Sequence, residues 1–273
     1  MTHRFRQVDV FTSVPFLGNP VAVVLDADGL NDEALQRFAR WTNLSETTFV
    51  MAPADADADY LVRIFTPSRE LPFAGHPTLG TCHAWLEAGG RPRDRGAIVQ
   101  ECGAGLIRIS RGQERLAFAA PPLIRSGAVE PGLIDRIAGI LGIAPEAILD
   151  SQWVDNGPGW VAVLLENAEA VLSVQPRQPV DMDLGVVGLY PRGHELAIEV
   201  RGFDMNVEDP VTGSLNASVA GWLLASGRVE APYIASQGTA IGRRGRVHIS
   251  TDADGTIWVG GETITCVEGE VRL

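Results

Sequence analysis

The sequence reads Gly18-Asn19-Pro20-Val21-Ala22-Val23-Val24-Leu25 near its start, and a stretch of the same kind follows in its second half, Gly157-Pro158-Gly159-Trp160-Val161-Ala162-Val163-Leu164-Leu165. In both stretches, turn-forming residues lead into a short, continuous apolar run. Such a run, bounded by glycine and proline, predicts a buried strand. The same strand is therefore expected once in each half of the chain.

A second pair of segments repeats in the same order. Arg63-Ile64-Phe65 precedes Ala84-Trp85-Leu86, and Val200-Arg201-Gly202-Phe203 precedes Gly221-Trp222-Leu223. Either match alone is within the reach of chance. Two matches in the same order, each separated by roughly half the chain, indicate an internal duplication.

Local patterns predict further elements inside each half. Asn31 is typical of a helix N-cap, and an apolar stripe follows it, made of Leu35, Phe38, Ala39 and Trp41 or Thr42. Residues 106–110 and 115–118 flank Arg111-Gly112-Gln113-Glu114 and predict a hairpin. Residues 133–141 predict a helix, and the stretch from residue 240 onward predicts short strands separated by glycines.

These patterns predict an α+β fold with two pseudo-symmetric halves, each a mixed or antiparallel sheet curled around a central helix. Pro121-Pro122 interrupts regular structure and marks the boundary. We expect an N-terminal half over residues 1–120 and a C-terminal half over residues 121–273, with a final strand that can pack back on the first half.

Composition narrows the class of function. The chain has 273 residues, 45% of them hydrophobic, and a formal net charge of −12, which argues against nucleic acid or an anionic membrane surface as a partner. Its three cysteines lie far apart and form no C-x-x-C pair, so no disulfide framework is expected. Because no apolar leader or long apolar run is present, we expect a cytoplasmic protein with a small-molecule partner.

Two loops contain small, polar residues, and each precedes one of the paired tryptophans. They are Ala74-Gly75-His76-Pro77-Thr78 and Glu208-Asp209-Pro210-Val211-Thr212-Gly213-Ser214. A helix start presents unpaired N–H groups, and Gly75 and Gly213 let a ligand approach that backbone closely. Two such starts facing each other predict a site for a carboxylate-bearing substrate, although each loop alone is also typical of an ordinary helix cap.

Three ionisable residues are candidates for chemistry. Glu46 lies among β-branched and aromatic neighbours, which favour the protonated acid and suit proton transfer; the alternative is a solvent-facing strand residue. His76 could polarise a substrate oxygen or relay a proton, or could only hydrogen-bond its own loop. Asp209 could bind a substrate amine or hydroxyl, but Asp before Pro is also a frequent turn starter.

Other motifs do not fit the chemistry they resemble. Residues 157–162 match the G-x-G-x-x-A pattern, but they lead into a predicted strand, whereas a dinucleotide site requires a helix there. His76 and His83 have no third ligand nearby, so no metal site is expected. Cys82 lies within an apolar helical pattern and is expected in the core rather than as a nucleophile.

Segments spread over the whole chain form one further pattern: Gln7-Val8-Asp9-Val10-Phe11-Thr12, Gly18-Asn19-Pro20-Val21-Ala22-Val23, Asn43-Leu44-Ser45-Glu46-Thr47-Thr48-Phe49-Val50, Arg63-Ile64-Phe65-Thr66-Pro67, Glu70-Leu71-Pro72-Phe73-Ala74-Gly75-His76-Pro77-Thr78-Leu79-Gly80, Asn156-Gly157-Pro158, Glu208-Asp209-Pro210-Val211-Thr212-Gly213-Ser214 and Gln237-Gly238. This pattern resembles the PhzF-like family of phenazine biosynthesis. The resemblance implies a diaminopimelate-epimerase-like fold with the active site between the halves, a homodimer, and no metal or organic cofactor.

The resemblance also implies roles for single residues. Glu46 matches the acid/base glutamate, Gly75 and His76 match a pair that lines the site, and Asp209 and Ser214 match substrate contacts. The approach to the second loop, residues 200–207, is shorter than in the phenazine enzyme. The acid/base group is therefore implied more strongly than the substrate, and phenazine synthesis is not implied.

The implied reaction is an isomerisation in which one carboxyl group moves a proton between two carbons on the same face of the substrate. A racemase or epimerase is the first alternative and would need Asp209 as the acid on the opposite face. Epimerase relatives use two cysteines in the paired loops, and this chain has none there. A non-catalytic protein that binds a small ligand is the second alternative.

Overall fold

The computed structural model describes residues 1–94, 96–112, 115–204 and 207–273. The chain divides into two compact units: unit 1 contains Met1–Ala119 and Gly260–Leu273, and unit 2 contains Ala120–Val259. The C-terminal segment thus belongs with the N-terminal residues, and the change of unit at Ala120 lies beside Pro121-Pro122. Within the described ranges, no helix is long and apolar enough to cross a membrane.

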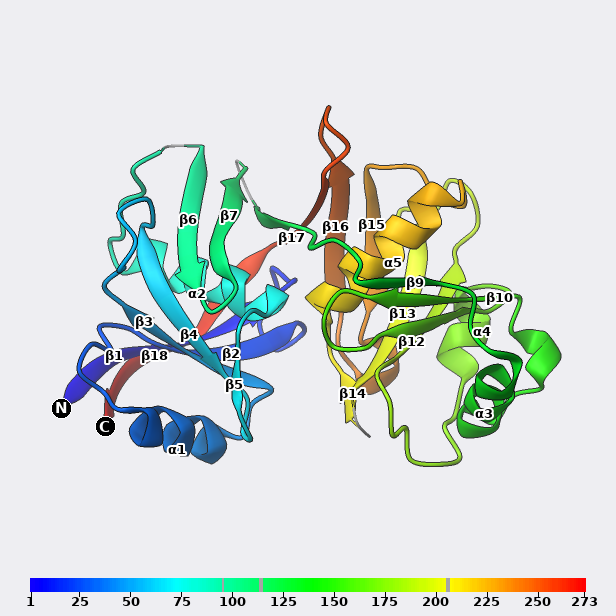
Figure 1. Ribbon diagram of the computed structural model, residues 1–273, viewed down its shortest axis with the longest axis horizontal. Coiled ribbons are helices and arrows are strands. Elements are labelled where there is room, and N and C mark those ends of the chain that lie inside the picture. Colours follow the sequence, from blue (N-terminus) through cyan, green and yellow to red (C-terminus); the bar gives the residue numbers. More distant parts are fainter. Residues whose placement is uncertain (95, 113–114, 205–206) are drawn as a thin grey trace. The chain divides into compact units, whose positions relative to one another are not determined.

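Unit 1 is a mixed sheet with two helices. Its elements are β1 (Thr2–Val10), β2 (Asn19–Val24), α1 (Asp32–Thr42), β3 (Glu46–Met51), β4 (Tyr60–Phe65), β5 (Glu70–Leu71), α2 (Gly75–Glu87), β6 (Ala97–Cys102), β7 (Gly105–Arg111), β8 (Leu116–Ala119) and β18 (Thr263–Arg272). The strands pair in the order β18-β1-β2-β3-β4-β6-β7-β8, with parallel pairing at β2–β3 and β4–β6. The final strand, β18, joins this sheet by pairing antiparallel with β1 (Figure 1).

Helix α2 forms the centre of unit 1. It packs against β1, β2, β3, β6, β8 and β18, and its residues from Gly75 through Cys82 are all buried. A helix that is buried on every side needs no polar face, which explains why it shows no apolar stripe in the sequence. Helix α1 packs on β3 and β4, with Leu35, Phe38 and Ala39 buried.

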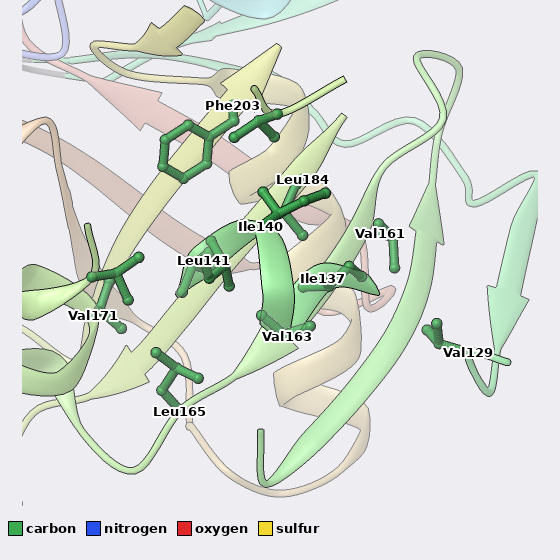
Figure 2. Close-up of a cluster of buried hydrophobic side chains, with 13 residues drawn as sticks. Val129, Ile137, Ile140, Leu141, Val161, Val163, Leu165, Val171, Leu184 and Phe203 are labelled. Carbon is green, nitrogen blue, oxygen red and sulfur yellow. The ribbon is translucent and has the colours of Figure 1, made fainter. Parts of the chain in front are cut away.

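Unit 2 contains β9 (Arg125–Gly127), α3 (Pro131–Leu141), the short helix η1 (Pro145–Ala147), β10 (Asp150–Asp155), β11 (Val161–Leu164), α4 (Ala168–Ser173), β12 (Leu184–Leu189), β13 (Ile198–Asp204), β14 (Val207–Asp209), α5 (Gly213–Ala225), β15 (Tyr233–Gln237), the short helix η2 (Thr239–Ile241), β16 (Gly245–Thr251) and most of β17 (Ile257–Gly261). Apolar side chains from α3, α4, β11 and β12 form a core cluster that includes Ile137, Val163, Val171 and Leu184 (Figure 2).

The two units repeat the same strand order. Unit 2 pairs β9-β10-β11-β12-β13-β15-β16, with parallel pairing at β11–β12 and β13–β15, which matches unit 1 strand for strand from β18 to β7. A 13-residue helix also lies at the equivalent point along the chain in each unit: α2 between β5 and β6, and α5 between β14 and β15. The same ion pair also recurs, Arg63 with Glu70 and Arg201 with Glu208. The predicted α+β fold and the internal repeat are confirmed.

Most local predictions are confirmed. Asn31 caps α1 by accepting a hydrogen bond from the Ala34 amide, and β7 and β8 form the predicted antiparallel hairpin. Of its turn, Gln113 and Glu114 lie outside the described residues. Of the two residues proposed for the end of the stripe, Thr42 faces the sheet: it is half-buried and its Oγ1 lies 2.8 Å from Thr47 Oγ1 of β3. Trp41 is 76% exposed and stacks on Phe38.

Close packing of α2 on the sheet depends on Gly80. A Cβ there would lie 2.4 Å from Val21 Cγ1 and 3.0 Å from Val10 Cγ2. We expect Gly80→Ala to lower the free energy of unfolding by about 1–3 kcal/mol through overpacking, despite the better helix propensity of alanine. A Cβ added at Gly139 in α3 would meet no neighbouring group within 4 Å, so Gly139→Ala should gain about 0.5–1 kcal/mol. Urea unfolding measures both, and equal shifts would contradict this account.

Candidate active site

Glu46 begins β3, where this strand lies beside β2. Parallel pairing places Glu46 opposite Val21. The next two residues, Thr47 and Thr48, are fully buried, whereas the Glu46 side chain keeps 16% exposure. The side chain is therefore largely desolvated, with its Oε2 buried, which is not the position of an ordinary surface strand residue.

His76 is the second residue of α2 and faces Glu46. Its Nε2 lies 3.3 Å from Glu46 Oε2, although the two atoms are not aligned as a hydrogen bond. Its Nδ1 lies 3.4 Å from Nδ2 of Asn19. Burial lowers the pKa of His76 from 6.5 to about 3 because the imidazolium would lose its hydration, and a hydrogen bond to the Pro20 backbone opposes this only in part. At neutral pH the ring is uncharged.

The start of α2 has no cap. Its N-cap residue, Ala74, has no polar side chain, and no acidic residue lies in the first turn. Pro77 has no N–H, so Gly75 and His76 provide the amides at this end. These amides, together with the helix dipole, form a positive end directly beside Glu46 and can bind an anionic group.

The start of α5 in unit 2 is also uncapped, for a different reason. Thr212 occupies the N-cap position but makes no side-chain bond to the helix. Its Oγ1 donates instead to Asp209 Oδ2, at 2.6 Å. Asp209 is the last residue of β14 and is half-buried. The loop thus presents a carboxylate held by Thr212 next to the N–H groups that Gly213 and Ser214 contribute at the helix start.

The hydroxyl of Ser214 has a fixed role. Trp160 Nε1 donates to Ser214 Oγ at 3.1 Å, and Asn156 Nδ2 donates to the Ser214 carbonyl at 3.0 Å. Because an indole N–H can only donate, Ser214 Oγ is the acceptor in the first bond. Its own proton remains directed elsewhere, so Ser214 can donate to an acceptor atom on a ligand.

The repeat shows that the acid/base candidate occurs in one unit only. Val161 of β11 pairs with Leu184 of β12 as Val21 of β2 pairs with Glu46 of β3. Glu46 therefore has a fully buried leucine as its counterpart in unit 2. At this equivalent position, unit 1 has a carboxyl group and unit 2 has an apolar core residue.

The thiols do not form a second acid/base group. Burial raises the pKa of Cys82 to about 12, and burial also raises the pKa of Cys102 and of Cys266. Cys82 is a core residue of α2, as expected from the sequence. Over the described ranges, no three His, Cys, Asp or Glu side chains gather as a metal site would require.

The structure thus brings Glu46, Gly75 and His76 together in unit 1, and Asp209, Gly213 and Ser214 together in unit 2. Sequence reasoning missed the partners that hold these groups. In the sequence, Asn19 and Trp160 stand out only as residues at strand starts. Gln237, whose buried amide bonds Thr212, stands out only as part of the family pattern. These side chains carry no titratable group that would have singled them out.

Comparison with solved structures gives the class of the fold. A PhzF-family protein of Bacillus anthracis superposes with a TM-score of 0.85 at 25% identity, covering 100% of both chains. A hydroxyproline epimerase of Agrobacterium vitis superposes with a TM-score of 0.59 at 13% identity, covering 99% of this chain and 91% of the other. The fold is therefore the one shared by PhzF proteins and proline-racemase-like epimerases, as expected.

Sequence comparison then gives the family. Residues 8–269 match the family described as phenazine biosynthesis-like protein, PhzC-PhzF, and the chain belongs to it. A Schizosaccharomyces pombe protein named antisense-enhancing sequence 1 is 34% identical, covering 98% of both chains. The trans-2,3-dihydro-3-hydroxyanthranilate isomerase of Pseudomonas aeruginosa is 32% identical, covering 99% of this chain and 100% of the other. The expected enzyme class, isomerase, is confirmed by such relatives.

Proposed function

We propose that this protein is a cofactor-independent isomerase that moves a proton between two carbons of a small, carboxylate-bearing substrate. Glu46 takes the proton from one carbon and returns it to another on the same face. The electron pair left behind is delocalised over the system that joins the two carbons. The observation that carries this proposal is the contact of a largely buried Glu46 with the uncharged ring of His76, beside the uncapped start of α2.

The surroundings of Glu46 suit a group that must both accept and release a proton. Desolvation makes a carboxylate more basic than it is in water. An imidazolium at 3.3 Å would oppose this by holding Glu46 in its charged form, but the low pKa of His76 keeps the ring neutral. Neutral His76 can then position the carboxyl group or a substrate oxygen without adding a fixed charge.

A single acid/base group favours a proton shift over inversion at one carbon. Inversion requires two groups on opposite faces, and the counterpart of Glu46 in unit 2 is Leu184. The raised pKa values of all three thiols leave them protonated and weakly reactive at neutral pH. Asp209 accepts a hydrogen bond from Thr212 at the start of α5, and this fixed position suits a residue that binds substrate.

The substrate class follows from the two helix starts. Both present amides without a cap, and Ser214 adds a hydroxyl donor at the start of α5. Such donors match carboxylate oxygens. We further propose a homodimer, as the family resemblance implies, that works in the cytoplasm. The trans-2,3-dihydro-3-hydroxyanthranilate named for several relatives is the first compound to examine as a substrate.

The test is transfer of deuterium from heavy water. The protein is incubated with that compound and with a panel of small amino and hydroxy carboxylic acids, and proton NMR follows the loss of carbon-bound hydrogen. We expect exchange at two carbons of one compound, together with a shifted double bond. Exchange at one stereocentre with inversion of optical rotation would instead indicate an epimerase. Tight binding without any exchange would indicate a ligand-binding protein.

The donor role of Ser214 predicts the effect of Trp160→Phe. This change keeps the buried apolar ring but removes the N–H that fixes the Ser214 hydroxyl. Because one hydrogen bond contributes about 0.5–1.5 kcal/mol, we expect the affinity for a carboxylate ligand to fall roughly two- to tenfold, measured by calorimetry. Trp258→Phe is the matched control, since its indole bonds Asp252 on an exposed turn. Equal affinities in the two variants would disprove the role given to Trp160.

A further inference from the structure

The loop before α5 contains a hydrogen-bond network that the proposed chemistry does not use. Gln237, the last residue of β15, is fully buried. Its Nε2 donates to the Asp209 carbonyl at 3.1 Å and to Thr212 Oγ1 at 2.9 Å, and its Oε1 accepts from the Thr212 amide at 3.0 Å and from Asn216 Nδ2 at 2.8 Å. A side-chain amide has two donor and two acceptor positions. All four are occupied, so the orientation of Gln237 is fixed.

Because of this network, Thr212 does not cap α5 with its side chain. A threonine at an N-cap position normally accepts a hydrogen bond from the second or third amide of its helix. Here Thr212 Oγ1 accepts from Gln237 and donates its only proton to Asp209. These two bonds hold the hydroxyl on Gln237 and Asp209, and its side chain makes no capping bond to α5. A residue suited to capping α5 is thus kept from doing so.

A glycine in the adjacent strand provides the space for this arrangement. A Cβ at Gly202 would lie 2.8 Å from Thr212 Oγ1 and 3.0 Å from Gln237 Nε2. Both distances are shorter than the contacts that a methyl group normally makes. Any larger residue at position 202 would press directly on the bond between Thr212 and Gln237.

Unit 1 offers an internal comparison. Gln100 of β6 is also fully buried, and its Nε2 donates to Thr78 Oγ1 in the first turn of α2. The N-cap of α2 is Ala74, which has no hydroxyl to be held. A buried glutamine therefore bonds to the central helix in both units. Of the two, Gln237 is the one that also bonds a residue able to cap its helix.

We propose that Gln237 is a positioning residue for the substrate-binding end of α5. By holding the Thr212 hydroxyl on Asp209, it orients the Asp209 carboxylate and leaves the first amides of α5 open to an anionic ligand. The identity of that ligand rests on the proposed function, whereas the action of Gln237 on Thr212 does not. The inference can therefore be tested without turnover.

The first test is hydrogen exchange of the α5 amides in Gln237→Glu. Glutamate still accepts from Thr212 and Asn216 but cannot donate to the Thr212 hydroxyl, and it repels Asp209. We expect Thr212 to turn back and cap the helix, so that exchange at Ser214 or Leu215 slows at least tenfold relative to the rest of α5. Exchange that is unchanged, or faster throughout unit 2, would show a merely structural role and overturn the proposal.

Two further variants keep the test decisive if Gln237→Glu folds poorly. Gly202→Ala should slow exchange at the same amides by pressing on the same bond. Thr212→Val removes the hydroxyl, so these amides should stay unprotected, and adding Gln237→Glu or Gly202→Ala to Thr212→Val should slow nothing further. Slowing that persists without the hydroxyl would refute the mechanism. Such a double-mutant comparison isolates the coupling from the general loss of stability.

The matched control is Gln100→Glu in unit 1. It removes a similar buried hydrogen bond, but it should not slow exchange at the start of α2, because Ala74 cannot cap that helix. A ligand readout is then added with 2-aminobenzoate as the carboxylate probe, whose affinity should fall at least tenfold in Gln237→Glu. A parent protein that binds no carboxylate would count against the proposed function, while the exchange result would still decide the role of Gln237.

Discussion

Glu46→Gln is expected to lower proton exchange into the substrate by about 10²–10⁴-fold, the usual contribution of general acid/base catalysis. The amide has nearly the shape of the acid, and it sits at the start of β3, where the side chain keeps 16% exposure. Fold and ligand affinity should therefore change little. Deuterium uptake from heavy water measures the exchange step directly, and calorimetry with the same ligand measures binding.

Two companion variants identify the role of the carboxyl group. Glu46→Asp keeps the acid but withdraws it by one methylene, so exchange should be only partly lost. Glu87→Gln is the matched control, because Glu87 lies at the far end of α2 and bonds Thr265 there. The distance along the helix from His76 is about 16 Å at 1.5 Å per residue. Exchange at the parent rate in Glu46→Gln would refute the assignment.

Much of the fold could be predicted because its signals are local. The apolar run from Val21 to Leu25 and the cap at Asn31 each depend on a few neighbouring residues. Repetition of such signals then revealed the duplication. The choice between Trp41 and Thr42 at the end of the stripe could not be made in this way, since it depends on which of the two side chains faces β3 once the helix has packed.

The titratable groups of the site could be predicted from the sequence, but the contacts that position them could not. Glu46 and His76 attract attention as residue types that transfer protons. Their contact at 3.3 Å depends on how a strand end meets a helix start, which is a tertiary property. Gln237 lies 25 positions from Thr212 and has no charge, so only the packing of β15 beside the loop reveals what it holds.

Acid should destabilise the parent protein more than it destabilises His76→Gln. The pKa of His76 is lowered to about 3 in the folded state, below its value of 6.5 in the unfolded chain. The unfolded state therefore binds more protons between these values, and stability falls as the pH drops from 6.5 towards 3. The amide of His76→Gln does not titrate, so this variant lacks the acid-dependent loss of stability. Its poorer fit should nevertheless cost stability at neutral pH.

Each pH unit below the unfolded-state pKa of His76 corresponds to about 1.4 kcal/mol. Between pH 6.5 and 4.5, the parent should therefore lose about 2–3 kcal/mol relative to His76→Gln, so that the gap between the two proteins closes or reverses. Urea unfolding at matched ionic strength measures this difference, with the slope of unfolding checked for equality. Repeating the pair in a Glu46→Gln background tests whether the neighbouring carboxyl group contributes. Parallel stability curves in both backgrounds would mean that His76 is solvated, and the neutral ring required beside Glu46 would then be lost.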